Sequence, residues 1–191
     1  MKARDRLIVA LDVPKADAAR ALVDRLAGRV GMFKVGSQAF TAAGPSLVQE
    51  IVARGEKVFL DLKFHDIPNT VAGAVASASR LGVSFVDVHG LGGRAMVEAA
   101  VGALPAMATR LLAITILTSH DEDTLDEIGV NGTMLDSVRR LALLAKEAGA
   151  DGVVASPHEV ALIREACGSD FLIVTPGIRP AGAARGDQSR A

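Results

Sequence analysis

Short apolar runs rich in β-branched residues alternate along the chain with longer segments in which Ala and Leu recur at helical spacing. The apolar runs predict strands at about residues 6–12, 32–36, 57–63, 85–90, 110–117, 151–156 and 171–177. The longer segments predict helices near residues 15–28, 38–54, 68–82, 93–104, 131–149 and 157–167. Strict alternation of strands and helices is typical of an α/β protein with a parallel sheet.

Almost every predicted strand ends with a polar residue, in phase with small or aliphatic residues earlier in the same strand. An open doubly wound sheet, with its ligand at a switch point, is one architecture for this pattern. A ring of polar groups above apolar layers is instead what the active face of a (β/α)8 TIM barrel requires, and we expect that fold. The polar residues are Asp12, Lys34, Asp61, Lys63, Asp87, His89, Thr118, Ser156 and Thr175.

The number of strands is one short of a closed barrel, which has eight strands and about 250 residues. With 191 residues, the chain is long enough for one sizeable core. A seven-stranded parallel sheet would leave two unpaired edges in water. We therefore expect a single barrel domain over residues 1–191 whose last βα unit is absent from the sequence, as in a fragment or an incomplete record of a longer protein.

Composition narrows the range of partners. The formal net charge is −1, there is no Trp or Tyr, and only six Phe are present, which removes the basic field and the stacking platforms of nucleic-acid binding. The apolar runs are strand-sized, and the first is cut short by Asp12 and Pro14, so neither a membrane span nor a signal peptide is expected. Cys167 is the single cysteine, which fits a reducing compartment. We expect a cytoplasmic protein without a nucleic-acid or membrane partner.

The ten residues from Asp61 to Thr70 form the most informative segment, Asp-Leu-Lys-Phe-His-Asp-Ile-Pro-Asn-Thr. Successive strand side chains alternate between faces, so Asp61 and Lys63 should point the same way. Asp66 follows three residues later. Charges are costly to bury unless they are paired, so this strand end is either a salt-bridge network or a reaction site.

Lys34 ends the neighbouring predicted strand. By itself it could be a lysine that extends to water from a strand end. In a barrel it would face Asp61 and Lys63 and, together with Asp66, complete an alternating array of positive and negative groups. Each carboxylate favours the protonated form of a neighbouring lysine, and an ammonium in a dry pocket can donate a proton.

The pattern Asp-x-Lys-x-x-Asp, with its extension from His65 to Thr70, resembles the catalytic motif of the orotidine 5′-phosphate decarboxylases. Three more segments match that family in the expected order, and the resemblance spans essentially the whole chain. They are Ala10-Leu11-Asp12-Val13, Leu117-Thr118-Ser119, and Pro176-Gly177-Ile178-Arg179-Pro180 followed by Gly186-Asp187-Gln188-Ser189-Arg190.

The resemblance implies decarboxylation of orotidine 5′-monophosphate to uridine 5′-monophosphate in de novo pyrimidine biosynthesis, with no cofactor and no metal. It implies that Lys63 is the proton donor and stabilises the carbanion within the array of Lys34, Asp61, Lys63 and Asp66. It also implies a homodimer with shared active sites, in which Asp66 and Thr70 reach the site of the other subunit.

The family assigns the remaining parts of the substrate to other positions. The match to Asp12 holds a ribose hydroxyl, and the turn with Thr118 contacts the pyrimidine ring. Arg179 and Gln188 match the residues that hold the phosphate, and a guanidinium fork suits phosphate geometry. The family's further Gly-Arg phosphate contact, on the eighth-strand turn, has no match here. Substrate-binding residues are thus expected to be Asp12, Lys34, Asp61, Thr70, Thr118, Arg179 and Gln188.

Other interpretations of these segments stay open. Asp12 could be an aspartate at a helix start, Thr118 part of a side-chain turn, and Asp87 with His89 a metal-ligand pair, although no second pair is evident. A related magnesium-dependent sugar-phosphate decarboxylase or aldolase shares Asp-x-Lys-x-x-Asp but not the Pro-Gly-Ile-Arg-Pro and Gly-Asp-Gln segments. A non-catalytic nucleotide-binding fragment is the other alternative.

Overall fold

The computed structural model describes residues 2–105, 109–179 and 190. In these residues seven strands form one sheet in which every neighbouring pair is parallel and the spatial order follows the sequence. The strands are β1 (Ile8–Ala10), β2 (Met32–Gly36), β3 (Val58–Phe64), β4 (Phe85–His89), β5 (Arg110–Ile114), β6 (Gly152–Val154) and β7 (Leu172–Val174).

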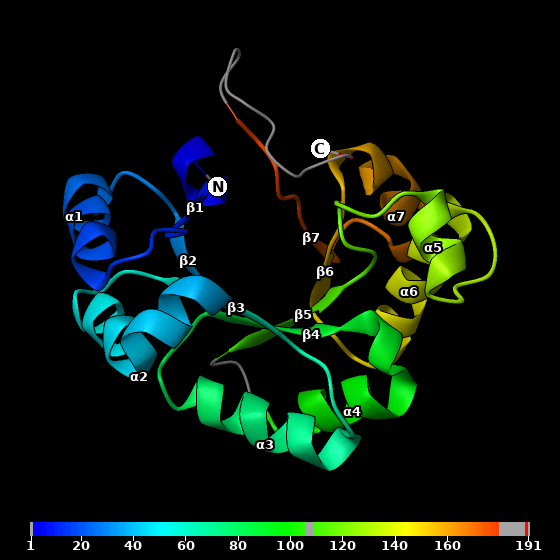
Figure 1. Cartoon of the computed structure of the whole chain (residues 1–191), viewed down its shortest axis with the longest axis horizontal. Helices are drawn as coiled ribbons and strands as arrows, with labels where there is room; N and C mark the ends of the chain where they lie inside the picture. Colours follow the sequence, from blue (N-terminus) through cyan, green and yellow to red (C-terminus); the bar gives the residue numbers. More distant parts are fainter. Residues whose placement is uncertain (1, 106–108, 180–189, 191) are drawn as a thin grey trace.

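The helices surround the outside of this curled sheet (Figure 1). They are α1 (Ala16–Leu26), α2 (Ser37–Ala53), α3 (Pro68–Ser79), α4 (Arg94–Gly102), α5 (Glu122–Glu127), α6 (Met134–Glu147) and α7 (Val160–Cys167), with short 3-10 turns η1 (Ala3–Arg6), η2 (Gly90–Gly92) and η3 (Pro157–Glu159). None of the described helices is long and apolar enough to cross a membrane.

The strand order decides between the two architectures considered for the sequence. A doubly wound sheet reverses its order at a switch point and carries helices on both faces. Here the order runs without reversal from β1 to β7, and the helices lie on one side only (Figure 1). The predicted barrel-type α/β fold is confirmed, with β1 and β7 each paired on one side among the described residues.

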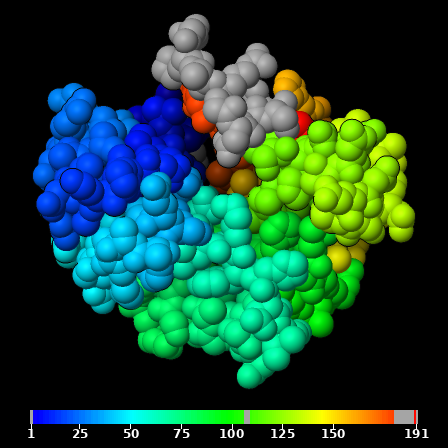
Figure 2. All heavy atoms as spheres, viewed as in Figure 1, coloured from blue at the N-terminus to red at the C-terminus, as the bar shows by residue number. Residues whose placement is uncertain are grey.

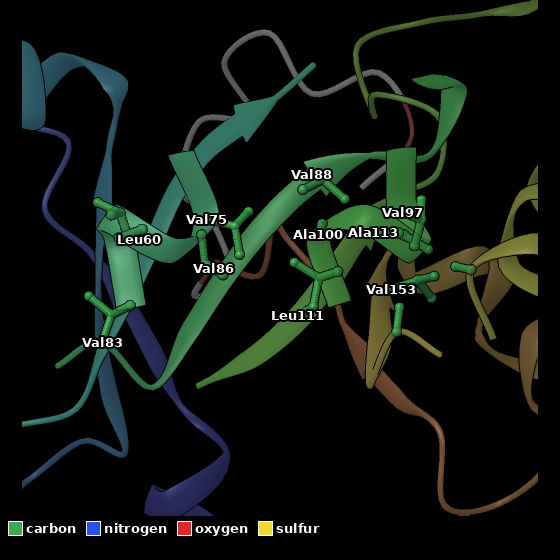
Figure 3. Packing of buried hydrophobic residues seen from close by; sticks show 14 of the residues in the cluster. Leu60, Val75, Val83, Val86, Val88, Val97, Ala100, Leu111, Ala113 and Val153 are labelled. Carbon is green, nitrogen blue, oxygen red and sulfur yellow. The ribbon is translucent and has the colours of Figure 1, made fainter. Parts of the chain in front are cut away.

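Two separate apolar clusters lie on the two faces of the sheet. The larger one fills the space between the strands and the helices, where Val86, Leu111 and Ala113 face Val97 and Ala100 of α4 (Figure 3). The smaller one lies inside the curl and is centred on Met32, Phe59 and Leu112. The inner cluster forms an apolar base below the polar strand ends, which is the layering expected of a barrel.

The structure corrects the predicted element boundaries in several places. The strands predicted at residues 6–12, 110–117, 151–156 and 171–177 are shorter, because their last residues leave the ladder to form loops. Helix α5 is not among the predicted helices; it begins after Asp121, whose side chain accepts a hydrogen bond from the Thr124 N–H at 3.0 Å. Helix α2 is kinked at Gly44, which has a φ of 67°, immediately before Pro45.

Candidate active site

A cavity of about 560 Å³ opens at the carboxyl ends of the strands. Figure 2 shows the hollow between the N-terminal elements, in blue, and the yellow-green segment that follows β5. Its base is apolar and its rim is polar, so a ligand with a hydrophobic ring and charged ends would suit it. The polar and loop residues that line it are Asp12, Lys34, Asp61, Lys63, Thr118, Ser119, Thr175, Pro176, Gly177 and Arg179.

Two lysines and two aspartates form a chain of charges along the cavity wall. Lys34 Nζ lies 3.0 Å from Asp61 Oδ2 and 3.2 Å from Asp12 Oδ1. Lys63 Nζ makes an ion pair with the other oxygen, Oδ1, of Asp61. The structure therefore brings together Lys34, Asp61 and Lys63, as the sequence pattern predicts, and adds Asp12 at the outer end.

The pKa values of Asp61 and Lys34 are both shifted in the direction that favours the charged form of the side chain. Burial opposes the charge on Asp61, but the neighbouring Asp87 side chain and the ammonium groups of Lys34 and Lys63 outweigh that effect, and the pKa of Asp61 lies below its ordinary value. Burial also opposes the charge on Lys34. The charges of Asp61 and Asp12 overcome it and raise the pKa of Lys34. The site thus holds an ionised carboxylate next to a protonated lysine.

Strand β3 is irregular where it presents Lys63. Leu60 pairs with Val86 and Phe64 with Val88, so four steps along β3 oppose two steps along β4. Lys63 has a φ of 51°, and among the described residues it is the one non-glycine residue with a positive φ. A non-glycine residue in this region costs about 1–3 kcal/mol and is commonly found at functional sites. Simple strand alternation, used in the sequence argument, therefore does not explain why Lys63 shares the cavity with Asp61.

Asp87 of β4 holds this bulge and was missed as a site residue by the sequence analysis. Its Oδ1 accepts hydrogen bonds from the backbone N–H groups of Leu62, at 3.0 Å, and Lys63, at 2.8 Å. Asp87 is completely buried. The available signal was a lone carboxylate inside an apolar strand, Phe85-Val86-Asp87-Val88-His89, which the sequence analysis weighed only as part of a metal pair.

Asp66 and Thr70 do not line the cavity of their own chain. The chain leaves β3 after Phe64 and turns outward into α3 at Pro68, and Asp66 Oδ1 accepts a hydrogen bond from the Ile67 N–H at 2.6 Å. All six residues from His65 to Thr70 are exposed. The expected four-residue array is thus not formed within one chain, because Asp66 is carried away from the cavity.

The predicted ring and phosphate contacts lie on the opposite wall. Thr118 is buried and lines the cavity, while Arg179 is exposed at its rim. Gly177, with a φ of 84°, provides a turn in this segment that a side chain would strain. Gln188, the other predicted phosphate ligand, lies outside the described residues.

Arg190 connects two loops at this end of the sheet, a role that the sequence analysis did not predict. Its guanidinium donates to the backbone carbonyls of His120, Leu117 and Ile116, at 2.8, 3.0 and 3.2 Å respectively. It also pairs with Glu159, which is almost completely buried. Arg190 therefore ties the loop after β5, which carries Thr118, to the turn after β6.

Comparisons with known proteins agree with the geometry. A model of the "Orotidine 5'-phosphate decarboxylase / HUMPS family" matches residues 5–191. The chain is 55% identical to the orotidine 5′-phosphate decarboxylase of Moorella thermoacetica, covering 100% of this chain and 79% of that protein. It is 57% identical to the enzyme of the same name from Halorhodospira halophila, covering 97% of this chain and 79% of that protein.

Solved structures give the same picture. The crystal structure of orotidine 5′-phosphate decarboxylase from Lactobacillus acidophilus superposes with a TM-score of 0.85 at 42% identity, over 92% of this chain and 82% of that one. An uncharacterized conserved protein from Geobacillus kaustophilus superposes with a TM-score of 0.83, also at 42% identity, over 88% of this chain and 82% of that one.

Proposed function

The chain belongs to the orotidine 5′-phosphate decarboxylase / HUMPS family, and we propose that it is a carbon–carbon lyase that converts orotidine 5′-monophosphate to uridine 5′-monophosphate and carbon dioxide in pyrimidine biosynthesis. The observation that carries the proposal is the buried Asp61 carboxylate between two lysines at the wall of the cavity. Relatives that are more than half identical over nearly the whole chain support this substrate over a sugar phosphate.

The reaction poses a problem of charge. When carbon dioxide leaves, the electron pair of the broken bond stays on ring carbon 6, where no carbonyl group or cofactor can delocalise it. The protein must stabilise this pair with fixed charges that are already in place. Lys63, paired with Asp61 at the edge of an apolar cavity, is the group suited to that task.

We assign Lys63 both the stabilisation and the proton transfer. The bond between carbon 6 and the carboxylate carbon breaks, carbon dioxide departs, and the electron pair remains on carbon 6 facing the ammonium. One N–H proton of Lys63 then forms the new carbon–hydrogen bond, and the neutral amine regains a proton from solvent. Asp61 holds the Lys63 ammonium in an ion pair before the step, and Lys34 holds the other oxygen of Asp61.

The rest of the substrate would be held away from the reacting carbon. Asp12 is positioned to accept a hydrogen bond from a ribose hydroxyl, and Thr118 to contact the pyrimidine ring. Arg179 and Gln188 would bind the phosphate, with Gln188 also reaching toward the base. Binding energy from the phosphate can then align the ring at Lys63.

We further propose a homodimer that acts in the cytoplasm and in which Asp66 and Thr70 of the partner subunit complete each site. The six exposed residues from His65 to Thr70 support this arrangement, since Ile67, a large apolar residue, is 68% exposed there. Asp66 also lies too far along the outward turn to join the array of its own chain. The single cysteine, Cys167, fits the reducing compartment.

The test is the loss of ultraviolet absorbance by orotidine 5′-monophosphate in the presence of the purified protein, with and without a metal chelator. We expect turnover that the chelator does not change. An absence of turnover would contradict the proposal and favour a non-catalytic nucleotide-binding protein. Activity on a sugar phosphate that the chelator removes would instead favour a magnesium-dependent relative.

A further inference from the structure

A completely buried carboxyl group, Asp87, lies behind the charged wall of the cavity without lining the cavity itself. Its two oxygens have different surroundings. Oδ1 accepts two backbone hydrogen bonds from the β3 bulge, at 3.0 and 2.8 Å. Oδ2 is buried and finds no donor in the described part of the chain. A buried acceptor without a donor is costly, so the state of Oδ2 calls for a physical explanation.

The side chain of Asp61 lies next to Asp87, because Leu60 and Val86, the residues before them, are paired in β3 and β4, and Asp61 interacts with Asp87 at hydrogen-bonding range. Two ionised carboxylates cannot bond to each other, because both only accept; one of them must carry a proton. Asp61 already has an ammonium group on each oxygen, which stabilises its ionised form. The proton therefore belongs on Oδ2 of Asp87, which turns the unpaired acceptor into a donor toward Asp61.

We propose that Asp87 is a positioning residue that works as a neutral carboxylic acid: its Oδ1 holds the backbone bulge that presents Lys63, and its protonated Oδ2 orients Asp61 between Lys34 and Lys63. The proposal deepens the function given above and rests on it for its kinetic consequences. Burial, followed by the charge of Asp61, raises the pKa of Asp87 well above its ordinary range, in agreement with this geometry.

The protonation state of Asp87 sets the charge balance of the site. With Asp87 neutral, the ammonium groups of Lys34 and Lys63 balance the carboxylates of Asp12 and Asp61. An ionised Asp87 would add one negative charge beside the site that must accept a substrate carboxylate. The groups that face Asp87 from β3 are Asp61 and Lys63, while its partner on β5 is the apolar Leu112.

Two substitutions test whether Asp87 acts as a neutral hydrogen-bonding group, through a negative charge, or only by filling space. Asp87→Asn keeps an acceptor for the bulge and provides an N–H donor for Asp61 without any charge. We expect it to keep kcat/KM within about threefold of the wild type. Asp87→Val removes both interactions at similar size, and we expect kcat to fall about 100-fold or more while the affinity for uridine 5′-monophosphate changes less than about tenfold.

The results that would overturn the proposal are equally specific. If Asp87→Asn loses as much activity as Asp87→Val, the residue acts through its charge. If Asp87→Val turns over like the wild type, it does not position the site. If the Val variant fails to fold, the Asn variant alone decides: a loss of most of the wild-type kcat/KM in Asp87→Asn would contradict the proposal.

A measurement without turnover separates this inference from the proposed function. The infrared spectrum of the protein near neutral pH should contain the C=O band of a protonated carboxylic acid, and Asp87→Asn should remove it. A wild-type spectrum without that band would overturn the inference even in an active enzyme. The band together with an inactive wild-type protein would support the inference about Asp87 and contradict the proposed decarboxylation.

Discussion

Two neighbouring aspartates, Asp61 in the cavity wall and Asp87 behind it, have pKa values that are shifted in opposite directions. Against the effect of burial, the Asp87 side chain and the ammonium groups of Lys34 and Lys63 hold the pKa of Asp61 below its ordinary value, whereas burial and the charge of Asp61 raise the pKa of Asp87. Pairs of titratable groups whose pKa values are pushed apart are typical of sites that move protons. Lys34 and Lys63 make ion pairs with Asp61, and neither makes an ion pair with Asp87 in the described residues, so the difference follows from where the ammonium groups lie.

His89 offers a prediction about stability and pH. Burial, followed by the positive charge of His65, lowers the pKa of His89 from 6.5 to about 4. Between these values the unfolded chain binds a proton that the folded protein does not, so the free energy of unfolding should decrease as the pH falls from 6.5 toward 4. Above pH 6.5 the residue should contribute no pH dependence.

The contribution of His89 can be measured by urea unfolding of the wild type and of variants at about pH 7 and about pH 4.5, which gives the free energy of unfolding of each protein at both pH values. His89→Gln should lose less stability than the wild type on this change of pH, because its side chain does not titrate. His158→Gln is the matched control, since His158 is exposed, and it should follow the wild type. An equal loss in wild type and His89→Gln would contradict the assignment.

Individual residues were predictable from the sequence where a motif fixed them. Lys34, Asp61 and Lys63 come together as expected: neighbouring parallel strands place Lys34 and Asp61 at the same edge, and the β3 bulge brings Lys63 to Asp61. Asp87 was not predictable as a partner of the Lys63 backbone, because that contact depends on a bulge that strand alternation does not indicate. The Arg190–Glu159 pair joins residues 31 apart through a loop whose course the sequence leaves open.

At the scale of elements, the contact between β6 and β7 depends on the absence of a side chain. A Cβ atom at Gly152 would lie 2.5 Å from Leu172 Cβ and would also press against the Leu172 carbonyl of the neighbouring strand. Neither strand can withdraw without breaking the pairing between them. These short strands carry the loops with Ala155 and Thr175 to the cavity.

Gly152→Ala should therefore lower the free energy of unfolding by about 1–3 kcal/mol, the usual cost of overpacking a filled interior. The measurement is a denaturant titration of the variant and the wild type. Gly73→Ala is the control: Gly73 lies inside α3, and a Cβ there would meet nothing within 4 Å. It should be neutral or raise stability by about 0.5–1 kcal/mol, as Ala does in helices. A Gly152→Ala variant as stable as this control would contradict the packing.

The elements themselves were largely predictable, because hydrophobic period and turn residues act locally. All seven strands were located, and Pro68 begins α3 as its position in the pattern suggests. The ends were less well predicted: residues 115–117 were assigned to a strand, but β5 ends at Ile114, and Ile116 and Leu117 lie in the following loop, where they line the cavity. The residue at which a strand ends depends on its neighbours in the folded barrel, and local sequence patterns carry no information about those neighbours.

At the scale of the whole molecule, the curled sheet puts residues from nearly every strand around one cavity while it turns the segment from His65 to Thr70 outward. The same geometry makes a shared site testable. Asp61→Ala and Asp66→Ala protomers should each be inactive alone. Mixed in equal amounts, they should recover activity, since a mixed dimer has one site with both aspartates, up to about a quarter of the wild-type sites.

Subunit exchange must be verified with differently tagged protomers before the rates are compared. Each variant treated in the same way without its counterpart is the control. Mixed dimers that form but stay inactive would contradict the contribution of Asp66 to the partner's site.

The most direct measurement is the turnover of orotidine 5′-monophosphate by Lys63→Ala beside its affinity for uridine 5′-monophosphate. Removal of the ammonium should reduce turnover to background, because the carbanion loses both its counter-charge and its proton source. Product affinity should change by less than about tenfold, since the interaction matters mainly in the transition state. A Lys63→Ala variant that decarboxylates at nearly the wild-type rate would contradict the central role of Lys63.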